Sequence, residues 1–123
     1  IFFYKMAKRA YDVVIWGATG FTGQIATKYI LETYPSIKFA IAGRNRDKLT
    51  GVLTGLSQQL GTNTNHVDVL VGSIDDKDSL IEISQKSKVI ISTAGPFARV
   101  GTPIVDACVT TGTNYCHITG EGP

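Results

Sequence analysis

Three regularly spaced glycines in the stretch GATGFTG, Gly17, Gly20 and Gly23, separate an apolar run from a helix-like pattern. Gly17 permits a sharp turn, Gly20 lets a phosphate approach the backbone because it has no Cβ, and Gly23 lets a helix pack closely on a strand. The free N–H groups and the dipole at a helix start attract phosphate. A turn without a ligand is the alternative. Strand, turn and helix in this order predict a dinucleotide site, with contacts from Gly17, Thr19, Gly20, Phe21, Thr22 and Gly23.

The residues after the second apolar run indicate which dinucleotide binds. NAD sites usually place a carboxylate there to bind the ribose 2′-hydroxyl, but this chain reads AGRNRDK, with Arg44 and no carboxylate before Asp47. A guanidinium forms charge-assisted hydrogen bonds to phosphate, so Arg44 favours NADP(H), with its 2′-phosphate, over NAD(H). Asn45, Arg46 and Lys48 are close enough in sequence to assist. The alternative is that Arg44 is a solvated surface charge.

Two more loops are expected at the same edge of the sheet. After the third strand, GSIDD offers Ser73 and Asp75 beside the expected adenine position. Helix capping by Asp75 or Asp76 explains these acidic residues equally well. After the fourth strand, TAGPF offers a small-residue backbone along the cofactor, with candidate contacts from Ala94, Gly95 and Pro96.

These loops require a framework of alternating strands and helices. Apolar runs predict strands at residues 13–16, 38–42, 67–71, 88–93 and 115–119. The periodicity between them predicts amphipathic helices, the first over residues 21–34 and the second capped by Asn45. A third is expected around residues 80–83. Apolar strands with helical crossovers predict an α/β fold, a doubly wound parallel (Rossmann) sheet with strand order 3-2-1-4-5.

The ends of the chain carry further signals. Thr102 followed by Pro103 predicts the start of the last helix, and Gly112 fits its C-terminal cap. Met6 is a candidate natural start, which would leave residues 1–5 outside the fold or disordered and residues 6–123 as an NADP-binding domain. Because the sequence stops four residues after the fifth strand, we expect the N-terminal part of a larger protein whose substrate domain is absent from this chain.

Composition excludes several classes of protein. The chain has 123 residues and is 43% hydrophobic with a net charge of +2, which fits one globular domain and argues against a nucleic-acid surface. No apolar stretch is long enough to span a bilayer. Cys108 and Cys116 fit neither a CxxC redox motif nor a zinc-ligand set, so no metal is expected. Both cysteines are interpreted as buried free thiols rather than a disulfide, in a reducing cytosol.

The segments YDVVIWGATGFTGQ, AIAGRNRDKL and STAGPFARVGTPIVDACVTTGTNYCHITGE together resemble the saccharopine dehydrogenase-like oxidoreductases, a family that includes trans-acting enoyl reductases. The resemblance implies an N-terminal NADP-binding Rossmann domain. It also implies cofactor roles for the three glycines, Arg44 and the Gly95–Pro96 loop. Family members commonly have an aspartate where this chain has Ser73, and an acidic residue where it has His117. His117 is interpreted as structural, and Glu121 marks the mouth of the active site without an assigned role.

Three functions are compatible with these residues. The first is the NADP(H)-binding domain of a saccharopine dehydrogenase-like oxidoreductase, whose small-molecule or lipid substrate, for example an enoyl lipid, would bind through the missing domain. The second is a non-catalytic dinucleotide-binding regulator or lipid-associated scaffold, and the third an atypical short-chain dehydrogenase. Catalytic residues are unassigned, and whether this chain alone is an enzyme is left open. We expect a homo-oligomer in the cytoplasm, with peripheral association to membranes or lipid droplets left open.

Overall fold

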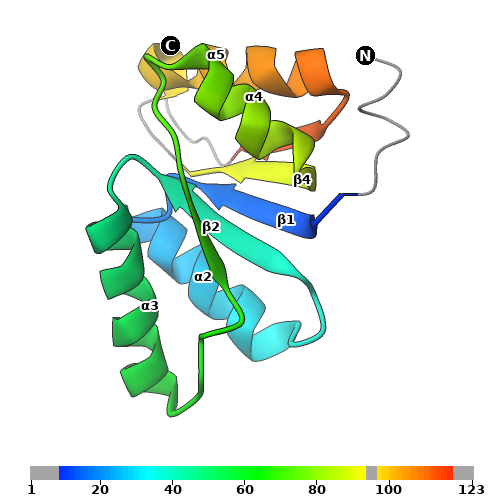
Figure 1. The fold of residues 1–123 in the computed structure, drawn as a ribbon. Helices are drawn as coiled ribbons and strands as arrows, with labels where there is room; N and C mark the ends of the chain where they lie inside the picture. Colours follow the sequence, from blue (N-terminus) through cyan, green and yellow to red (C-terminus); the bar gives the residue numbers. More distant parts are fainter. Residues whose placement is uncertain (1–8, 94–96, 118–123) are drawn as a thin grey trace.

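A computed structural model describes residues 9–93 and 97–117 of the chain. Within these residues, five strands form one parallel sheet in the order β3-β2-β1-β4-β5. The doubly wound α/β fold and its predicted strand order are therefore confirmed (Figure 1). The strands are β1 (Tyr11–Trp16), β2 (Phe39–Gly43), β3 (Asp68–Val71), β4 (Ser87–Ser92) and β5 (Asn114–His117). The helices are α2 (Phe21–Thr33), α3 (Arg46–Leu60), α4 (Lys77–Gln85) and α5 (Phe97–Thr111).

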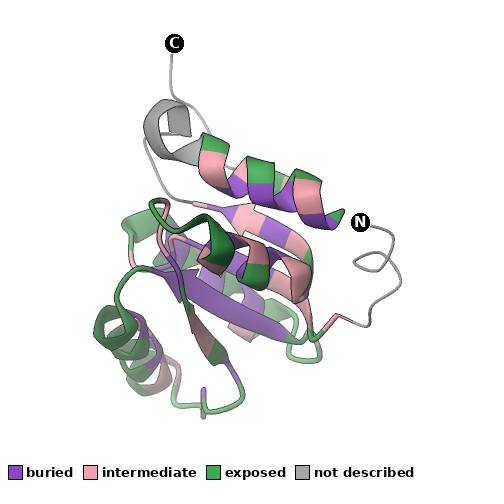
Figure 2. Ribbon diagram, turned by 45° about the horizontal axis from the view of Figure 1, so that its top comes forward, coloured by how far each residue is buried: buried purple, intermediate pink, exposed green. Residues whose placement is uncertain are grey.

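The helices form a layer on each side of the sheet (Figure 1). Right-handed crossovers put α2 and α3 on one face and α4 and α5 on the other, because the chain first moves toward β3 and then back toward β5. Strand β2 is buried along its whole length, whereas β4 combines buried residues with exposed Lys88 and the partly buried Val89 and Ile91 (Figure 2). The core beneath α4 and α5 includes Val14, Trp16, Ala40, Ile90 and Ile104. The core beneath α2 and α3 includes Ile15, Ile30, Ile41, Leu49 and Leu53.

The starts of three helices differ in how they are capped. The Asn45 side chain accepts a hydrogen bond from the Lys48 N–H at 3.1 Å, which confirms the predicted cap of α3. Asp76 caps α4 in the same way through the Ser79 N–H at 3.3 Å, so of the two acidic candidates Asp76 is the cap. Helix α2 begins after Gly20 without a side-chain cap within the described residues. The first N–H groups of α2 are therefore left without a side-chain acceptor from that part of the chain.

Two predictions about the last βα unit are wrong. Helix α5 begins at Phe97, so Thr102 and Pro103 lie inside it rather than at its start. Proline prefers the first turn of a helix, but inside α5 Pro103 only removes the N–H that would bond to the carbonyl four residues earlier, and the helix continues at that cost. Cys116 is exposed, whereas Cys108 is buried as expected, and both thiols are free. Cys116 lies on β5 at the edge of the sheet, where the described helices pack on only one face. Gly112 has φ 70°, which confirms the predicted C-terminal cap.

Arg9 joins four segments at the amino edge of the sheet, a role that the sequence pattern did not reveal. Its guanidinium donates hydrogen bonds to the carbonyl oxygens of Ser84 at 3.1 Å, Ser87 at 3.3 Å and Thr111 at 2.8 Å. It also donates to the Thr113 hydroxyl at 3.0 Å. The planar guanidinium suits this role because its donors point in several fixed directions. Arg9 thus ties the ends of α4 and α5 to the start of β4.

Candidate functional site

The glycine-rich turn leaves β1 at the carboxyl edge of the sheet. Gly17 has φ 83°, a conformation that favours glycine, and this confirms the sharp turn predicted there. Its N–H donates to the Ala42 carbonyl of β2 at 2.9 Å, and the Gly20 N–H donates back to the Gly17 carbonyl at 3.2 Å. The Thr93 hydroxyl, after β4, donates to the carbonyls of Trp16 at 3.0 Å and Gly17 at 3.1 Å. Three strand ends therefore hold the turn in place.

The other two glycines meet very different surroundings. A Cβ on Gly23 would lie 2.6 Å from both the Ala18 Cα and the Gly17 carbonyl oxygen. This confirms that Gly23 allows helix α2 to pack close to the turn. A Cβ on Gly20 would meet only the Gly17 oxygen, at 3.7 Å, an ordinary contact. Nothing described in the protein requires glycine at position 20, so the space beside it is open to a ligand.

The start of α2 faces this open space. Its first turn contains no acidic residue, so no carboxylate there would repel an anion. Phe21 is 81% exposed, and Thr22 is also exposed. The exposed N–H groups of a helix start and the positive end of its dipole together attract phosphate. The geometry of the turn is therefore suited to a pyrophosphate.

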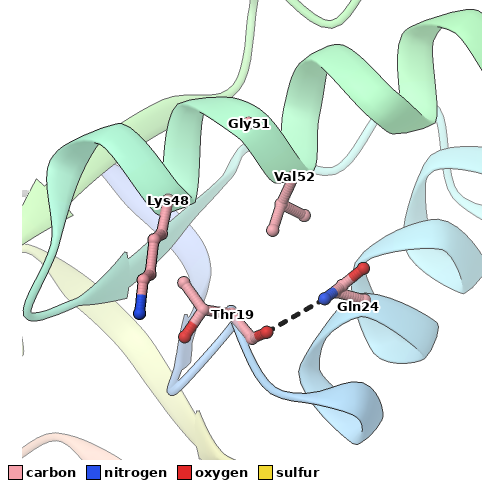
Figure 3. Close-up of a pocket in the computed structure, with 5 residues that line it drawn as sticks. All are labelled: Thr19, Gln24, Lys48, Gly51 and Val52. Atoms are coloured by element: carbon pink, nitrogen blue, oxygen red, sulfur yellow. Dashed lines mark hydrogen bonds between the residues drawn. The ribbon is translucent and has the colours of Figure 1, made fainter.

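Basic residues follow β2 on the neighbouring loop. Arg44 and Asn45 are exposed between β2 and α3. Lys48, one turn into α3, extends toward Thr19 of the glycine-rich turn (Figure 3). Between α2 and α3 lies an open pocket of about 290 Å³, lined by Thr19, Gln24, Lys48, Gly51 and Val52. One cationic side chain, that of Lys48, and Thr19 of the glycine-rich turn therefore line the same pocket.

Gln24 and Gly51 line this pocket although the sequence pattern did not single them out as site residues. The Gln24 side-chain amide donates to the Thr19 carbonyl at 2.9 Å and fixes that side of the turn (Figure 3). A Cβ on Gly51 would have no neighbour within 4 Å. A glycine inside a helix, where it weakens the helix, was the one signal in the sequence that could have indicated the pocket.

The loop after β3 is internally bonded. The Gly72 N–H donates to the Gly43 carbonyl at 2.9 Å, which ties this loop to the end of β2. The Ser73 hydroxyl accepts from the Asp75 N–H at 3.2 Å, and the Ser73 N–H donates to the Ser79 hydroxyl at 3.1 Å. Asp75 is exposed. The predicted residues Ser73 and Asp75 therefore lie at the carboxyl edge, in a turn that their own hydrogen bonds stabilise.

Several predicted positions fall elsewhere. Ala94, Gly95, Pro96 and Glu121 lie outside the described residues. His117 ends β5, with its ring centroid 5.6 Å from that of Tyr115. Within residues 9–93 and 97–117, no three His, Cys, Asp or Glu side chains gather as a metal site would require. No helix in that part of the chain is long and apolar enough to cross a membrane.

Known proteins resemble this chain along most of its length. The family model of the saccharopine dehydrogenase NADP binding domain matches residues 13–120. A lipid droplet localized protein of Caenorhabditis elegans is 37% identical over 113 residues, covering 90% of this chain and 26% of that protein. A trans-acting enoyl reductase of Mycobacterium leprae is 33% identical over 114 residues, covering 93% of this chain and 26% of the reductase. The chain thus spans about a quarter of the length of these curated relatives.

Solved structures support the fold. Saccharopine dehydrogenase (L-Glu forming) from Saccharomyces cerevisiae superposes with a TM-score of 0.68 at 17% identity, over 92% of this chain and 22% of that one. A short-chain dehydrogenase/reductase from Veillonella parvula in complex with NADP gives a TM-score of 0.69 at 21% identity, over 89% of this chain and 48% of that one. These likenesses support the fold alone, and the family match identifies the cofactor. The chain belongs to the saccharopine dehydrogenase NADP-binding domain family, and its cofactor is NADP(H).

Proposed function

We propose that this chain holds NADP(H) across the carboxyl ends of β1, β2 and β3, with the pyrophosphate at the start of α2. The observation that carries the proposal is the contrast between helix starts: Asn45 and Asp76 cap α3 and α4, whereas Gly20 leaves α2 uncapped within the described residues. A pyrophosphate would accept hydrogen bonds there in place of a capping side chain. The proposed contact residues are Gly17, Thr19, Gly20, Phe21, Thr22, Gly23, Arg44, Asn45, Ser73 and Asp75.

The basic residues after β2 are proposed to bind the 2′-phosphate. Arg44 directly follows the last residue of β2, and Lys48 lines one pocket with Thr19. Asn45 uses its side-chain oxygen as the cap of α3, so its contribution to the cofactor would come from its amide NH₂. Hydrogen bonds to a charged group contribute about 1.5–3 kcal/mol. Arg44 would then favour NADPH over NADH by roughly 10- to 100-fold.

The reaction would be completed by polypeptide that this chain does not contain. NADPH supplies a hydride when bound, and the residues described here would bind and orient it. The curated relatives are about four times as long as this chain, which supports a separate substrate-binding part. The name of the Mycobacterium leprae relative, a trans-acting enoyl reductase, supports an enoyl substrate, and the name of the Caenorhabditis elegans relative, a lipid droplet localized protein, supports a lipid-type one.

A second candidate function is a lipid-associated, non-catalytic dinucleotide-binding protein. The Caenorhabditis elegans relative, named as localised to lipid droplets, is the observation that favours it. The same relative supports cytoplasmic localisation with association to lipid droplets. We also propose that the isolated chain forms a homo-oligomer, because β5 is an edge strand of the sheet, and unpaired strand edges promote association.

Cofactor titration tests the main proposal. NADPH and NADH are titrated into the purified chain and followed by cofactor fluorescence, for the wild type, Arg44→Ala and Lys38→Ala. Lys38→Ala removes an exposed positive charge at the opposite end of β2 and controls for net charge. We expect Arg44→Ala to weaken NADPH binding by roughly 10- to 100-fold with NADH unchanged. A preference for NADPH that survives in Arg44→Ala would refute the role of this side chain.

A further inference from the structure

Among residues 9–93 and 97–117, the helices cover one face of the sheet over only part of its width. Ile15 of β1 pairs with Ile91 of β4, and Ile91 with Cys116 of β5, so the three side chains point to the same face. Ile15 is fully buried beneath α2 and α3. Ile91 and Val89 are only partly buried, and Cys116 is exposed. Ile90, which points to the opposite face, is fully buried against the core under α4 and α5.

The order of the strands explains this asymmetry. Helix α2 contacts β1, α3 contacts β2 and β3, and the remaining helices pack on β4 and β5 from the other side. Right-handed crossovers dictate this arrangement for a chain that reverses direction after β3. Strands of a parallel sheet are ordinarily buried on both faces, and β4 has the matching apolar sequence SKVIIS. Its uncovered side therefore lacks an expected layer within the described residues.

The exposed side of helix α2 stands beside the uncovered face of β4 and β5. Ile25 is 52% exposed and Tyr29 is 55% exposed. Gln24 lines the pocket between α2 and α3, and at about 100° per residue Ile25 and Tyr29 lie roughly 100° and 140° further around the helix. Tyr29 is therefore turned away from α3, whereas Ile25 lies about 160° around the helix from the buried residues Gly23 and Thr27 and points away from the sheet. An α-helix is about 10 Å thick, so α2 rises well above the uncovered face of β4 and β5.

We infer that this surface, formed by Tyr29, Val89, Ile91 and Cys116, is where a helix of the same polypeptide packs in the longer protein. The inference rests on the proposed function, in which the rest of the polypeptide supplies the substrate-binding part. Relatives that are about four times as long provide the covering chain. All four side chains are uncharged, so the covering helix is apolar on the facing side. A flat lipid surface would touch α2 but would not reach the uncovered residues of β4 and β5 beside it. A helix, in contrast, could lie on these two strands and contact α2 at the same time.

Thiol reactivity tests the inference, with Cys116 as the reporter and buried Cys108 as the internal control for unfolding. The isolated 123-residue chain and the full-length protein are alkylated without cofactor, and modification of each cysteine is followed by peptide mass spectrometry. We expect Cys116 to react rapidly in the isolated chain and at least about tenfold more slowly in the full-length protein. Cys108 stays slow in both. Equal Cys116 rates in the two forms would overturn the inference.

Other occupants give different results. Protection of Cys116 in the isolated chain that grows with protein concentration would indicate a second copy on this surface, since pairing of two β5 edges leaves the face itself open. Protection of the full-length protein that requires phospholipid vesicles would indicate a lipid surface. Either result would overturn the inference.

A pair of variants provides a second readout. Tyr29→Lys should lower the melting temperature of the full-length protein by several degrees and leave that of the isolated chain nearly unchanged, since a lysine there is solvated only when the surface is open. Val109→Lys is the matched control, because Val109 is 73% exposed on α5 on the other side of the sheet. NADPH titration of the same samples separates the two proposals. If the full-length protein binds NADPH while its Cys116 reacts rapidly, only the docking surface is refuted. If its Cys116 is protected but it does not bind NADPH, only the proposed function is refuted.

Discussion

Replacing Gly20 by valine should remove cofactor binding while keeping the fold. The backbone at Gly20 has φ −74° and ψ 168°, an extended conformation that valine adopts without strain. A Cβ there meets only the Gly17 carbonyl oxygen, at 3.7 Å. We therefore expect the free energy of unfolding to fall by no more than about 1 kcal/mol, the cost of an apolar residue in place of glycine at a helix N-cap.

The loss of binding follows from the space that the valine methyl groups would occupy. They would stand beside the start of α2, where the pyrophosphate is proposed to accept backbone hydrogen bonds. A hydrogen bond to a charged group contributes about 1.5–3 kcal/mol. Loss of even one such bond weakens binding by roughly 10- to 150-fold, and NADPH and NADH should be affected equally because both contain the pyrophosphate.

Gly23→Ala is the contrasting control. Its Cβ would lie 2.6 Å from the Ala18 Cα and 2.8 Å from the Thr93 hydroxyl oxygen. Because backbone atoms must shift to accept it, we expect a loss of about 1–3 kcal/mol in the free energy of unfolding. The two glycines, three residues apart, should thus separate binding from stability.

The assay combines urea unfolding with fluorescence titration of both cofactors for the wild type, Gly20→Val and Gly23→Ala. The expected pattern is a stable Gly20→Val protein that no longer binds, and a destabilised Gly23→Ala protein. A folded Gly20→Val variant that binds NADPH with wild-type affinity would refute the pyrophosphate position. Equal destabilisation by the two substitutions would refute the argument from local space.

Three further outcomes are expected. Arg9→Met should lower the free energy of unfolding by about 1–3 kcal/mol in urea titrations, because the carbonyls that Arg9 binds lose a charged donor; an unchanged midpoint would contradict this. Burial and the hydrogen bond to Asp68 raise the pKa of Tyr11 to about 12, so the protonated phenol stabilises the fold below pH 10 and this contribution is lost between pH 10 and 12. The stability difference between wild type and Tyr11→Phe should shrink over that range, and a constant difference would argue against it. The 123-residue chain should bind NADPH without consuming it in the presence of enoyl or imine substrates, since hydride transfer needs a substrate held within about 3–3.5 Å of the nicotinamide; steady absorbance loss at the NADPH band would contradict this.

The sequence alone determined the architecture and predicted the place of the cofactor site. Apolar runs alternating with helical periodicity led to the parallel sheet and its strand order, because handed crossovers allow few arrangements. The roles of Gly17 and Gly23 were also readable, since only glycine accepts a positive φ or so close a helix contact. These features depend on local residue types, which a sequence displays directly.

Tertiary structure decided what depends on residues far apart in the chain. Arg9 bonds to Thr111, 102 positions away, and no local pattern indicates such a partner. The exposure of Cys116 and the partial exposure of Ile91 follow from lying at or near an edge of the sheet on a face without a helix within the described residues. The apolar residues of β4 are compatible with burial on both faces of the sheet, and only the arrangement of the helices determines which face is covered.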